Sequence, residues 1–340
     1  MVQTVFAICD KEKGYAEKLF EFIHTKESSV FKVVLFTKTE ECQTFLKDKQ
    51  IGILLISDEC RREYVDSINA ANTIILSKTH SIDTVEDAYI YKYQAAETIL
   101  KKVMEYCAEK EALSFRRNCE KPLSIIGIYS PIKKAFQTTF AITLGQILAQ
   151  KGKTLYLNFE SFSGFDSVMA SRNKADLMDL MYFWTCSDDK FSIRLESVIE
   201  HIGQMDYVPP VHSFTNYEGI SGKQWLEFIK AFEEYSDYEY LILDLSENVN
   251  GLFDVLRICK SVFTVTDNRR ISTAKLMQYE SLLQESCYED VIDKTRKIKI
   301  PVFREIPEHF DMLPYSDLAK YIKKELSVEH DKAKDPQVVL

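Results

Sequence analysis

The sequence lacks any apolar run that approaches the ~20 residues needed to span a bilayer. We expect no signal peptide, because the start, MVQTVFAICDKEKG, is too polar after Cys9 to form one. The eight cysteines are scattered singly and show no C-x-x-C or other metal-ligand spacing, and the six histidines are equally dispersed. These absences predict a cytoplasmic protein with reduced thiols and no transmembrane segment.

An excess of positive charge is also absent. The chain carries 43 Lys and Arg against 52 Asp and Glu, which gives a net charge of −9. This balance argues against broad binding to nucleic acid or to an anionic membrane, and we expect no nucleic-acid partner. Pairs such as Arg61-Arg62 and Arg269-Arg270 could form small basic patches, although solvated surface is the plainer interpretation. The length of 340 residues and the apolar share of 46% indicate about two globular domains.

The first third of the chain alternates short apolar runs with amphipathic segments. We expect strands over residues 4–9, 32–36, 51–57, 73–77 and 89–91, and helices over residues 12–23 and about 95–107. Five strands with intervening helices predict a doubly wound parallel sheet over residues 1–110. The number and spacing of these strands resemble those of a response-regulator receiver domain.

The resemblance to a receiver implies a set of residues at the ends of the strands. A receiver holds Mg²⁺ with acidic residues after its first strand, and Asp10 could be one of them, with Ser77 as the hydroxyl and Lys92 as the lysine. Ser57 takes the position of the phosphoacceptor aspartate, and Asp58 follows one residue late. A single carboxylate makes a weak Mg²⁺ site. We therefore expect a phosphorylation-independent pseudo-receiver; in the plainer alternative Asp10 caps a helix and Lys92 is a surface charge.

A second domain is expected over residues 123–328, after a polar, charged linker at residues 111–122. We expect its strands at residues 154–159, 206–211, 240–245, 261–266 and 297–306, and helices at 225–236, 272–285 and 318–326. An apolar helix near residues 177–184 is rich in aromatic side chains, which could serve the core or a partner surface. The polar residues 329–340 predict a frayed tail.

Residues 124–140, SIIGIYSPIKKAFQTTF, organise this second domain. Ile125, Ile126 and Ile128 form a short apolar run, Ser130-Pro131 breaks it, and apolar residues then recur at helical spacing. Phosphates bind at such a strand-turn-helix junction, where glycines let backbone N–H groups surround phosphate oxygens and a lysine reaches the β- and γ-phosphates.

This stretch resembles the deviant Walker A motif, K-G-G-x-G-K-T-T, of ParA/MinD-like ATPases, but it retains only the two final threonines. The aligned positions are Ile132 for the signature lysine, Lys133 and Lys134 for two glycines, Phe136 for the third, Gln137 for the phosphate-binding lysine, and Thr138 and Thr139 for the threonines. Non-glycine residues at positive φ cost about 1–3 kcal/mol each, so the usual loop shape is not expected.

Other positions of the ParA/MinD-like site match the motifs of that family only in part. The resemblance places Asn158 and Glu160 at an Asp-x-Asp that organises the attacking water and metal, and Asn158 cannot act as a base. Asp244 ends an apolar strand and matches the Walker B aspartate. Thr138 and Asp244 would then hold Mg²⁺, while Lys133 or Lys134 could supply charge to a phosphate of ATP.

Three functions of different classes follow from these residues. In the first, the P-loop fold is a non-catalytic scaffold that has lost hydrolysis. In the alternative, it is a switch that binds ATP and Mg²⁺ without rapid turnover. The third, a working ATPase, is disfavoured because no phosphate-binding lysine is in register.

A receiver-like domain joined to a degenerate ParA/MinD-like domain resembles the TadZ/CpaE group of pilus-assembly and localisation proteins. The resemblance is carried by the order of the domains and by the stretches GIYSP…QTTFA, YLNFESFSGF, YEYLILDLSENVNG and PYSDLAKYIKKEL. It implies a cytoplasmic homodimer that acts as a hub for pilus or secretion machinery and is recruited to a cell pole or to membrane-bound machinery through partners. The final helix lacks the basic, strongly amphipathic character of membrane-docking relatives.

Overall fold

The computed structural model describes residues 4–27, 31–48, 51–63, 70–79, 88–109, 122–133, 136–169, 175–186, 191–303 and 305–332. The chain divides into two compact units. One comprises Met1–Asn118 with Phe183–Ser197 and Glu234–Ser236, and the other comprises the rest. The predicted linker at 111–122 lies outside the described residues except at its last position, and so do residues 333–340 of the predicted tail.

The first unit contains a five-stranded sheet in the order β2-β1-β3-β4-β5, in which all neighbouring strands are parallel. The strands are β1 (Thr4–Cys9), β2 (Phe31–Phe36), β3 (Ile51–Ser57), β4 (Ala70–Ser77) and β5 (Ala88–Tyr91). The helices are α1 (Lys13–Glu27), α2 (Thr39–Asp48), α3 (Asp58–Arg62) and α4 (Ala96–Glu109). The predicted doubly wound parallel sheet is confirmed in this unit.

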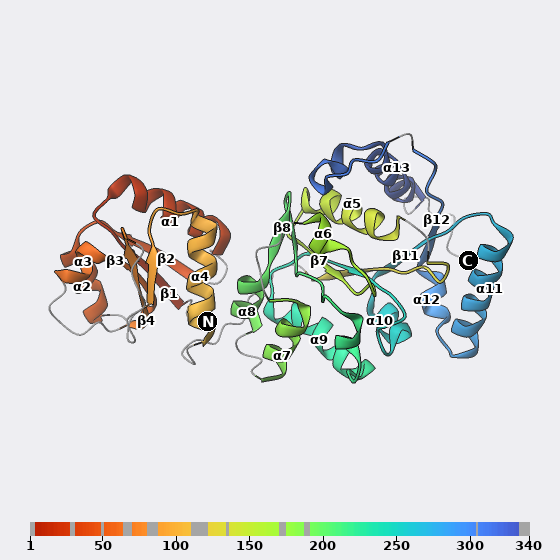
Figure 1. Ribbon diagram of the computed structural model, residues 1–340, viewed down its shortest axis with the longest axis horizontal. Coiled ribbons are helices and arrows are strands. Elements are labelled where there is room, and N and C mark those ends of the chain that lie inside the picture. Colours follow the sequence, from red (N-terminus) through yellow and green to blue (C-terminus); the bar gives the residue numbers. More distant parts are fainter. Residues whose placement is uncertain are drawn as a thin grey trace. The chain divides into compact units, whose positions relative to one another are not determined.

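Side chains that alternate along each strand fill two cores, one on each face of this sheet. Phe6, Ile8 and Ile53 pack with residues of α1 and α4, whereas Ala7 and Cys9 pack with residues of α2 and α3. Figure 1 accordingly shows α2 and α3 on the face opposite α1 and α4. The strands are apolar on both faces because helices cover both.

The second unit contains a seven-stranded sheet in the order β12-β11-β6-β10-β7-β9-β8. Its strands are β6 (Ser124–Ile128), β7 (Thr154–Asn158), β8 (Glu200–Ile202), β9 (Met205–Tyr207), β10 (Tyr240–Asp244), β11 (Ser261–Val265) and β12 (Thr295–Ile298). The remaining α-helices of the chain are α5 (Gln137–Ala149), α6 (Phe165–Val168), α7 (Leu177–Cys186), α8 (Phe191–Val198), α9 (Gly222–Tyr235), α10 (Leu252–Ile258), α11 (Arg270–Glu285), α12 (Glu289–Asp293) and α13 (Asp317–Lys332). Of these, α8 falls within the first unit's segment Phe183–Ser197, except for its last residue. Two 3-10 turns, η2 (Phe214–Tyr217) and η3 (Phe310–Tyr315), complete the described elements.

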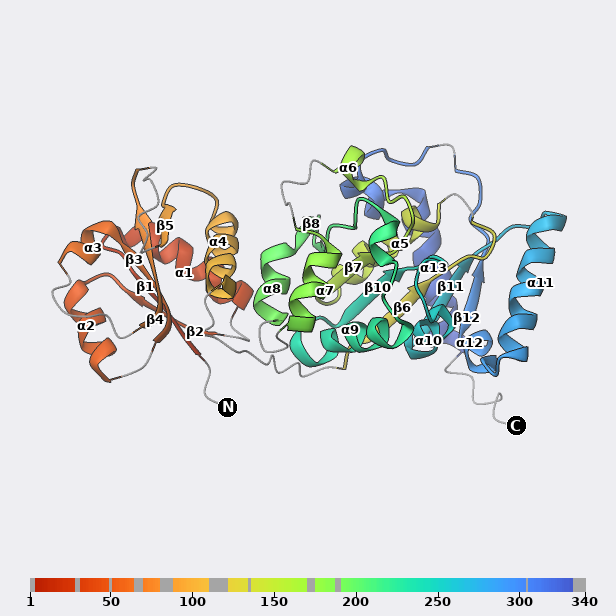
Figure 2. The same cartoon turned by 60° about the horizontal axis from the view of Figure 1, so that its bottom comes forward.

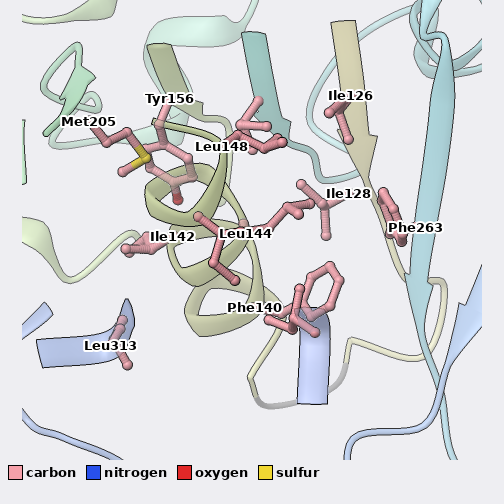
Figure 3. Close-up of a cluster of buried hydrophobic side chains, with 14 of the residues drawn as sticks. Ile126, Ile128, Phe140, Ile142, Leu144, Leu148, Tyr156, Met205, Phe263 and Leu313 are labelled. Atoms are coloured by element: carbon pink, nitrogen blue, oxygen red, sulfur yellow. The ribbon is translucent and has the colours of Figure 1, made fainter. Parts of the chain in front are cut away.

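Helix α5 lies at the centre of a hydrophobic core of the second unit. It is buried along most of its length, and Figures 1 and 2 show it with α13 on the face of the sheet opposite α9 and α10. Figure 3 shows Phe140, Leu144 and Leu148 of this helix beside Ile126 and Phe263 of the sheet. This packing fixes the start of α5 against the ends of the central strands.

Four expectations for the second domain and the tail after it were wrong in detail. The sheet is not wholly parallel, because β8 pairs antiparallel with β9. Strand β9 ends at Tyr207 rather than residue 211, since Pro209 and Pro210 cannot donate ladder hydrogen bonds. β12 covers only the start of the predicted 297–306 strand, and α13 continues to Lys332, into the predicted tail.

The aromatic-rich segment near residues 177–184 forms α7, as predicted. Leu177, Leu180 and Met181 are buried, whereas Tyr182 is 64% exposed. This helix therefore contributes mainly to the core, in agreement with the plainer of the two interpretations.

Candidate functional site

The carboxyl ends of three adjacent parallel strands meet at the start of α5. β10 pairs with β6 on one side and β7 on the other, so that Asp244 lies beside Ile128 and Asn158. The loop after β6 leads directly into α5, whose first residue is Gln137. Ligands of open α/β proteins bind at this edge of the sheet. The topology therefore gathers Gln137, Thr138, Asn158, Glu160 and Asp244 at one place.

The loop before α5 contains non-glycine residues in the left-handed region. Lys133 has φ +47°, and Phe136, at the N-cap of α5, has φ +77°. Phe136 supplies no side-chain cap to the helix. These positions correspond to two of the predicted glycine replacements, and they retain glycine-like backbone conformations at an energetic cost. Lys134 lies outside the described residues.

The side-chain amide of Gln137 occupies the middle of the site. Its Nε2 donates to Asp244 Oδ1 at 2.8 Å, to Glu160 Oε1 at 2.9 Å and to the carbonyl oxygen of Leu245 at 3.0 Å. An amide has two N–H hydrogens and no charge, whereas these three acceptors include two carboxyl groups. A lysine ammonium would provide three hydrogens and one positive charge. Gln137 has two hydrogens for three acceptors and neutralises neither carboxyl group.

The second oxygen of Asp244 is also fully engaged by protein donors. Thr138 Oγ1 donates to Oδ2 at 2.7 Å, and the Tyr156 hydroxyl donates to it at 2.9 Å. Asn158 Nδ2 lies 2.7 Å from the Tyr156 oxygen and 3.4 Å from Asp244 Oδ2. Asp244 is completely buried. Its lone pairs are therefore used inside the protein rather than directed at a ligand.

Burial raises the pKa values of both carboxyl groups in this cluster. Burial, followed by the charges of Asp244 and Glu247, raises the pKa of Glu160 to about 7. Burial also raises the pKa of Asp244, although hydrogen bonds from Gln137, Thr138 and Tyr156 act in the opposite direction. The buried carboxyl group of Asp244 and the half-buried one of Glu160 share one neutral amide, so the site favours holding a proton on Glu160 near neutral pH.

A pocket of about 280 Å³ opens beside this cluster. Eleven residues line it, namely Tyr129, Ser130, Lys133, Phe136, Gln137, Thr138, Glu160, Phe162, Leu245, Ser246 and Glu247. Lys133 is its basic lining residue, and its Nζ lies 3.2 Å from Glu247 Oε2. The described part of the pocket wall therefore contains two carboxyl groups, those of Glu160 and Glu247, and one lysine.

These residues do not fit ATP and Mg²⁺ in the manner that the ParA/MinD-like resemblance implies. A triphosphate needs positive charge at the position of Gln137, where this protein has a neutral amide bound to the carboxyl groups of Glu160 and Asp244. Among the described residues, no group of three or more His, Cys, Asp or Glu side chains is arranged to hold a metal ion. Thr138 and Asp244 remain the nearest oxygen pair for Mg²⁺, but they are hydrogen-bonded to each other.

The other residues of the predicted site lie nearby but outside this network. Thr139 follows on the first turn of α5, where its carbonyl oxygen accepts from Thr143, and Ile132 is half-buried in the loop. Tyr156 was missed by sequence reasoning. Its signal was the period of two along β7, which places it on the same face as Asn158.

The receiver-like residues of the first unit form a second polar cluster. Lys92 is buried, and its Nζ lies 2.6 Å from Asp10 Oδ2 and 2.8 Å from Glu12 Oε2. Burial opposes its charge, but hydrogen bonds to Asp10 and Glu12 outweigh burial and raise the pKa of Lys92. The alternative that Lys92 is a surface charge is therefore wrong. Asp10 Oδ1 also accepts from the backbone N–H of Glu12 at 2.9 Å, so it does stabilise the turn into α1.

The positions expected around a phosphoacceptor carry other contacts. Ser57 caps α3 by accepting from the backbone N–H of Cys60, and Ser77 Oγ accepts from the backbone N–H of Thr79. Asp58 lies one residue beyond the strand and pairs with Arg62 at 3.0 Å. A pocket of about 250 Å³ is lined by Ser57, Asp58 and Lys92 among others, but Ser77 does not line it.

Comparisons with known proteins found similarity in fold only. No family model and no curated protein matches the sequence. A ParA family ATPase from Chlorobium tepidum aligns with a TM-score of 0.48 and 18% identity, over 59% of this chain and 98% of that one. A plasmid partition protein from Borrelia burgdorferi aligns with a TM-score of 0.46 and 14% identity, over 63% and 100%. A cobyrinic acid a,c-diamide synthase from Mycobacterium smegmatis gives 0.40 and 11%, over 58% and 81%. The search for membrane-spanning helices among the described residues found no candidate.

Proposed function

We propose that this protein is a non-hydrolysing scaffold or localisation protein, built on a ParA/MinD-like P-loop fold and of the TadZ/CpaE type. The contact between Gln137 and Asp244 carries the proposal. A neutral amide lies where such ATPases use a lysine, and the amide is held by the two carboxyl groups of Asp244 and Glu160. Phosphate would have to break these contacts without bringing a compensating charge interaction.

Loss of hydrolysis also follows from the residues around the amide. Asn158 cannot accept a proton from an attacking water, and its amide nitrogen donates to Tyr156. Both oxygens of Asp244 are occupied by Gln137, Thr138 and Tyr156. This arrangement supports a structural role for the site, in which a polar network locks α5 to β7 and β10.

Self-association is proposed to occur through apolar packing around the pocket. Nucleotide-sandwich dimers of this superfamily use the signature lysine, and Ile132 replaces it here. Phe162 is 85% exposed and Phe136 is 45% exposed, and both line the pocket. Such side chains favour contact with a second copy without nucleotide. The proposed role is a cytoplasmic hub that positions pilus or secretion machinery, with the first unit as a pseudo-receiver.

The test combines a phosphate-release assay with light scattering in nucleotide-free buffer. The proposal expects no phosphate release above background and a dimer that persists without ATP. Phe162→Ser should weaken the dimer, whereas Tyr315→Ser, at a site that is 74% exposed and away from the pocket, should leave it unchanged. Steady phosphate release that is lost in Thr138→Ala would contradict the non-hydrolysing role, and a monomeric wild type would contradict self-association.

A nucleotide-binding switch is the second candidate. It is favoured by the pocket of about 280 Å³ and by Lys133, whose side chain is 71% exposed and lines that pocket. In this case Lys133 would exchange Glu247 for a phosphate, and Thr138 would approach the metal. Binding without turnover would distinguish this candidate from the scaffold.

A further inference from the structure

A second pocket lies on the α5 and α13 side of the seven-stranded sheet. Its volume is about 450 Å³, and its lining is formed by Ile126, Leu144, Ile147, Leu148, Gln150, Lys151, Ser261, Phe263, Arg296, Lys323 and Leu326. None of these residues lines the pocket at Gln137. The volume is within the ordinary range for a small-molecule site, roughly 300–1,000 Å³.

The base of this pocket is apolar. Ile126 pairs with Ser261 across β6 and β11, and Phe263 lies two residues further along, so both apolar side chains are on the face that α5 covers. Leu144 and Leu148, one turn apart on α5, complete this base, and Figure 3 shows these four residues around the helix. A ligand chain that enters here would exchange water for hydrocarbon.

The remaining charged lining residues are all basic. Lys151 follows the end of α5, Arg296 lies on β12, and Lys323 lies on α13 three residues before Leu326. These three residues form the basic rim of the pocket. The Arg296 guanidinium lies 5.3 Å from the centre of the Phe263 ring, so this rim residue contacts the apolar base. Among the described residues that line this pocket there is no carboxylate, although the whole chain carries a net charge of −9.

We propose that this pocket binds a free, single-chain anionic amphiphile, namely a medium-chain fatty acid or a chemically equivalent carboxylate. Its aliphatic chain would lie against Leu144, Leu148 and Phe263, and its carboxylate would be bound by the basic rim. The apolar base excludes a polar anion as the principal ligand, because buried phosphate or sugar groups would lack partners there. A peptide helix would need a longer groove than a pocket of this size provides.

The test is calorimetric titration of the full-length protein with decanoate and, separately, with decanol. We expect decanoate to bind saturably at one site per chain, below its aggregation concentration, and at least tenfold more tightly than decanol. Lys151→Glu and Lys323→Glu are at exposed positions, so they should fold normally and weaken decanoate binding at least fivefold each. Lys275→Glu, which is exposed on α11 away from the pocket, is the matched control and should bind as the wild type does.

A second variant probes the apolar half of the site. Ser261→Leu should fill the space opposite Ile126 and weaken decanoate and decanol equally. Absence of decanoate binding, equal affinity for decanol, or unchanged affinity in both lysine variants would each overturn the proposal. Sedimentation with phosphatidylglycerol vesicles that depends on Lys151 and Lys323 in the absence of decanoate binding would also overturn it, in favour of a membrane surface.

Discussion

The side-chain nitrogen of Gln137 lies 2.8 Å from Oδ1 of Asp244, at the junction where the loop after β6 enters α5. This hydrogen bond replaces the ion pair that a lysine at the same position would form. The replacement leaves the negative charge in the site without a buried positive partner, and the raised pKa values of Asp244 and Glu160 follow from burial under that condition. The consequences can be measured without any nucleotide.

Gln137→Lys should supply the missing charge. An ammonium at this position offers three hydrogens to the oxygens of Asp244, Glu160 and Leu245. We expect the pKa of Glu160 to fall from about 7 toward 4.5, as measured by carbon NMR of its carboxyl group. The control is Gln137→Met, which has similar length and no donors. Gln137→Met should destabilise the fold by about 1–3 kcal/mol. An unchanged pKa of Glu160 in the Gln137→Lys variant would refute the charge argument.

The stability of the protein should depend on pH through Glu160. Its pKa in the folded state, about 7, is above the ordinary value of 4.5, so the folded protein binds more protons than the unfolded chain between these values. The contribution of Glu160 is fully present below pH 4.5 and is lost as pH rises through 7. Compared with Glu160→Gln, the wild type should lose about 1–2 kcal/mol over this window, allowing for partial exposure.

Chemical denaturation at several pH values measures this difference directly. Glu218→Gln, a change at an exposed position, provides the matched control and should follow the wild type at every pH. Parallel stability curves for the wild type and Glu160→Gln would show that Glu160 titrates normally in the folded state, against the expectation.

Phe136→Gly should remove backbone strain at the start of α5. Phe136 has φ +77°, which glycine adopts without the steric cost that a Cβ imposes. Phe136→Ala removes the same ring but keeps the Cβ, so it is the matched comparison. We expect the glycine variant to be about 1 kcal/mol more stable than the alanine variant in thermal or chemical denaturation. Equal stabilities, or a more stable alanine variant, would argue that this conformation carries no strain.

In the first unit, Lys92→Met should be strongly destabilising. Lys92 is 1% exposed and Asp10 is 2% exposed, and removal of the lysine leaves a buried carboxylate without its partner. The expected loss is about 3–5 kcal/mol in the free energy of unfolding. Lys78→Met removes an exposed ion pair with Glu59, which solvent screens, and should leave the stability nearly unchanged. A loss no larger than that of Lys78→Met would contradict the importance of the buried pair.

Acetyl phosphate should not label the first unit. Ser57 ends β3 at the position where the receiver resemblance expects an acceptor carboxylate, and Asp58, one residue later, is paired with Arg62. Lys92 is held by Asp10 and Glu12, so it is not directed at an acceptor. Intact mass measurement after incubation with acetyl phosphate and Mg²⁺ should show no added phosphoryl group. Labelling that disappears in Asp58→Asn would contradict the pseudo-receiver interpretation.

Much of this arrangement follows from local sequence patterns. The strand ends at Asn158 and Asp244 could be predicted from apolar runs that stop at polar residues, and the carboxyl ends of adjacent parallel strands bring such residues together. The pairing of Gln137 with Glu160 was not predicted, because it depends on the path of the loop after β7. The antiparallel β8 was missed because three residues, Glu200–Ile202, carry too short a pattern to recognise.

Other features depend on contacts between distant parts of the chain. Lys92 contacts both Asp10 and Glu12 because the parallel strands β1 and β5 have their carboxyl ends on the same side of the sheet. The sequence places these two strands far apart. The basic rim of the 450 Å³ pocket combines Lys151 with Arg296 and Lys323 from the opposite end of the second unit's sequence. No local periodicity predicts such a cluster, since each of these residues is an ordinary surface cation within its own element.

The most direct test of the central claim is calorimetric titration of the wild-type protein with ATP and Mg²⁺. The amide of Gln137 provides no charge for a phosphate, and Asp244 has no free oxygen for a metal-bound water. We therefore predict no heat of binding up to millimolar ATP. Saturable, tight binding that disappears in Lys133→Ala or Lys134→Ala would contradict the scaffold account and would establish the nucleotide switch instead.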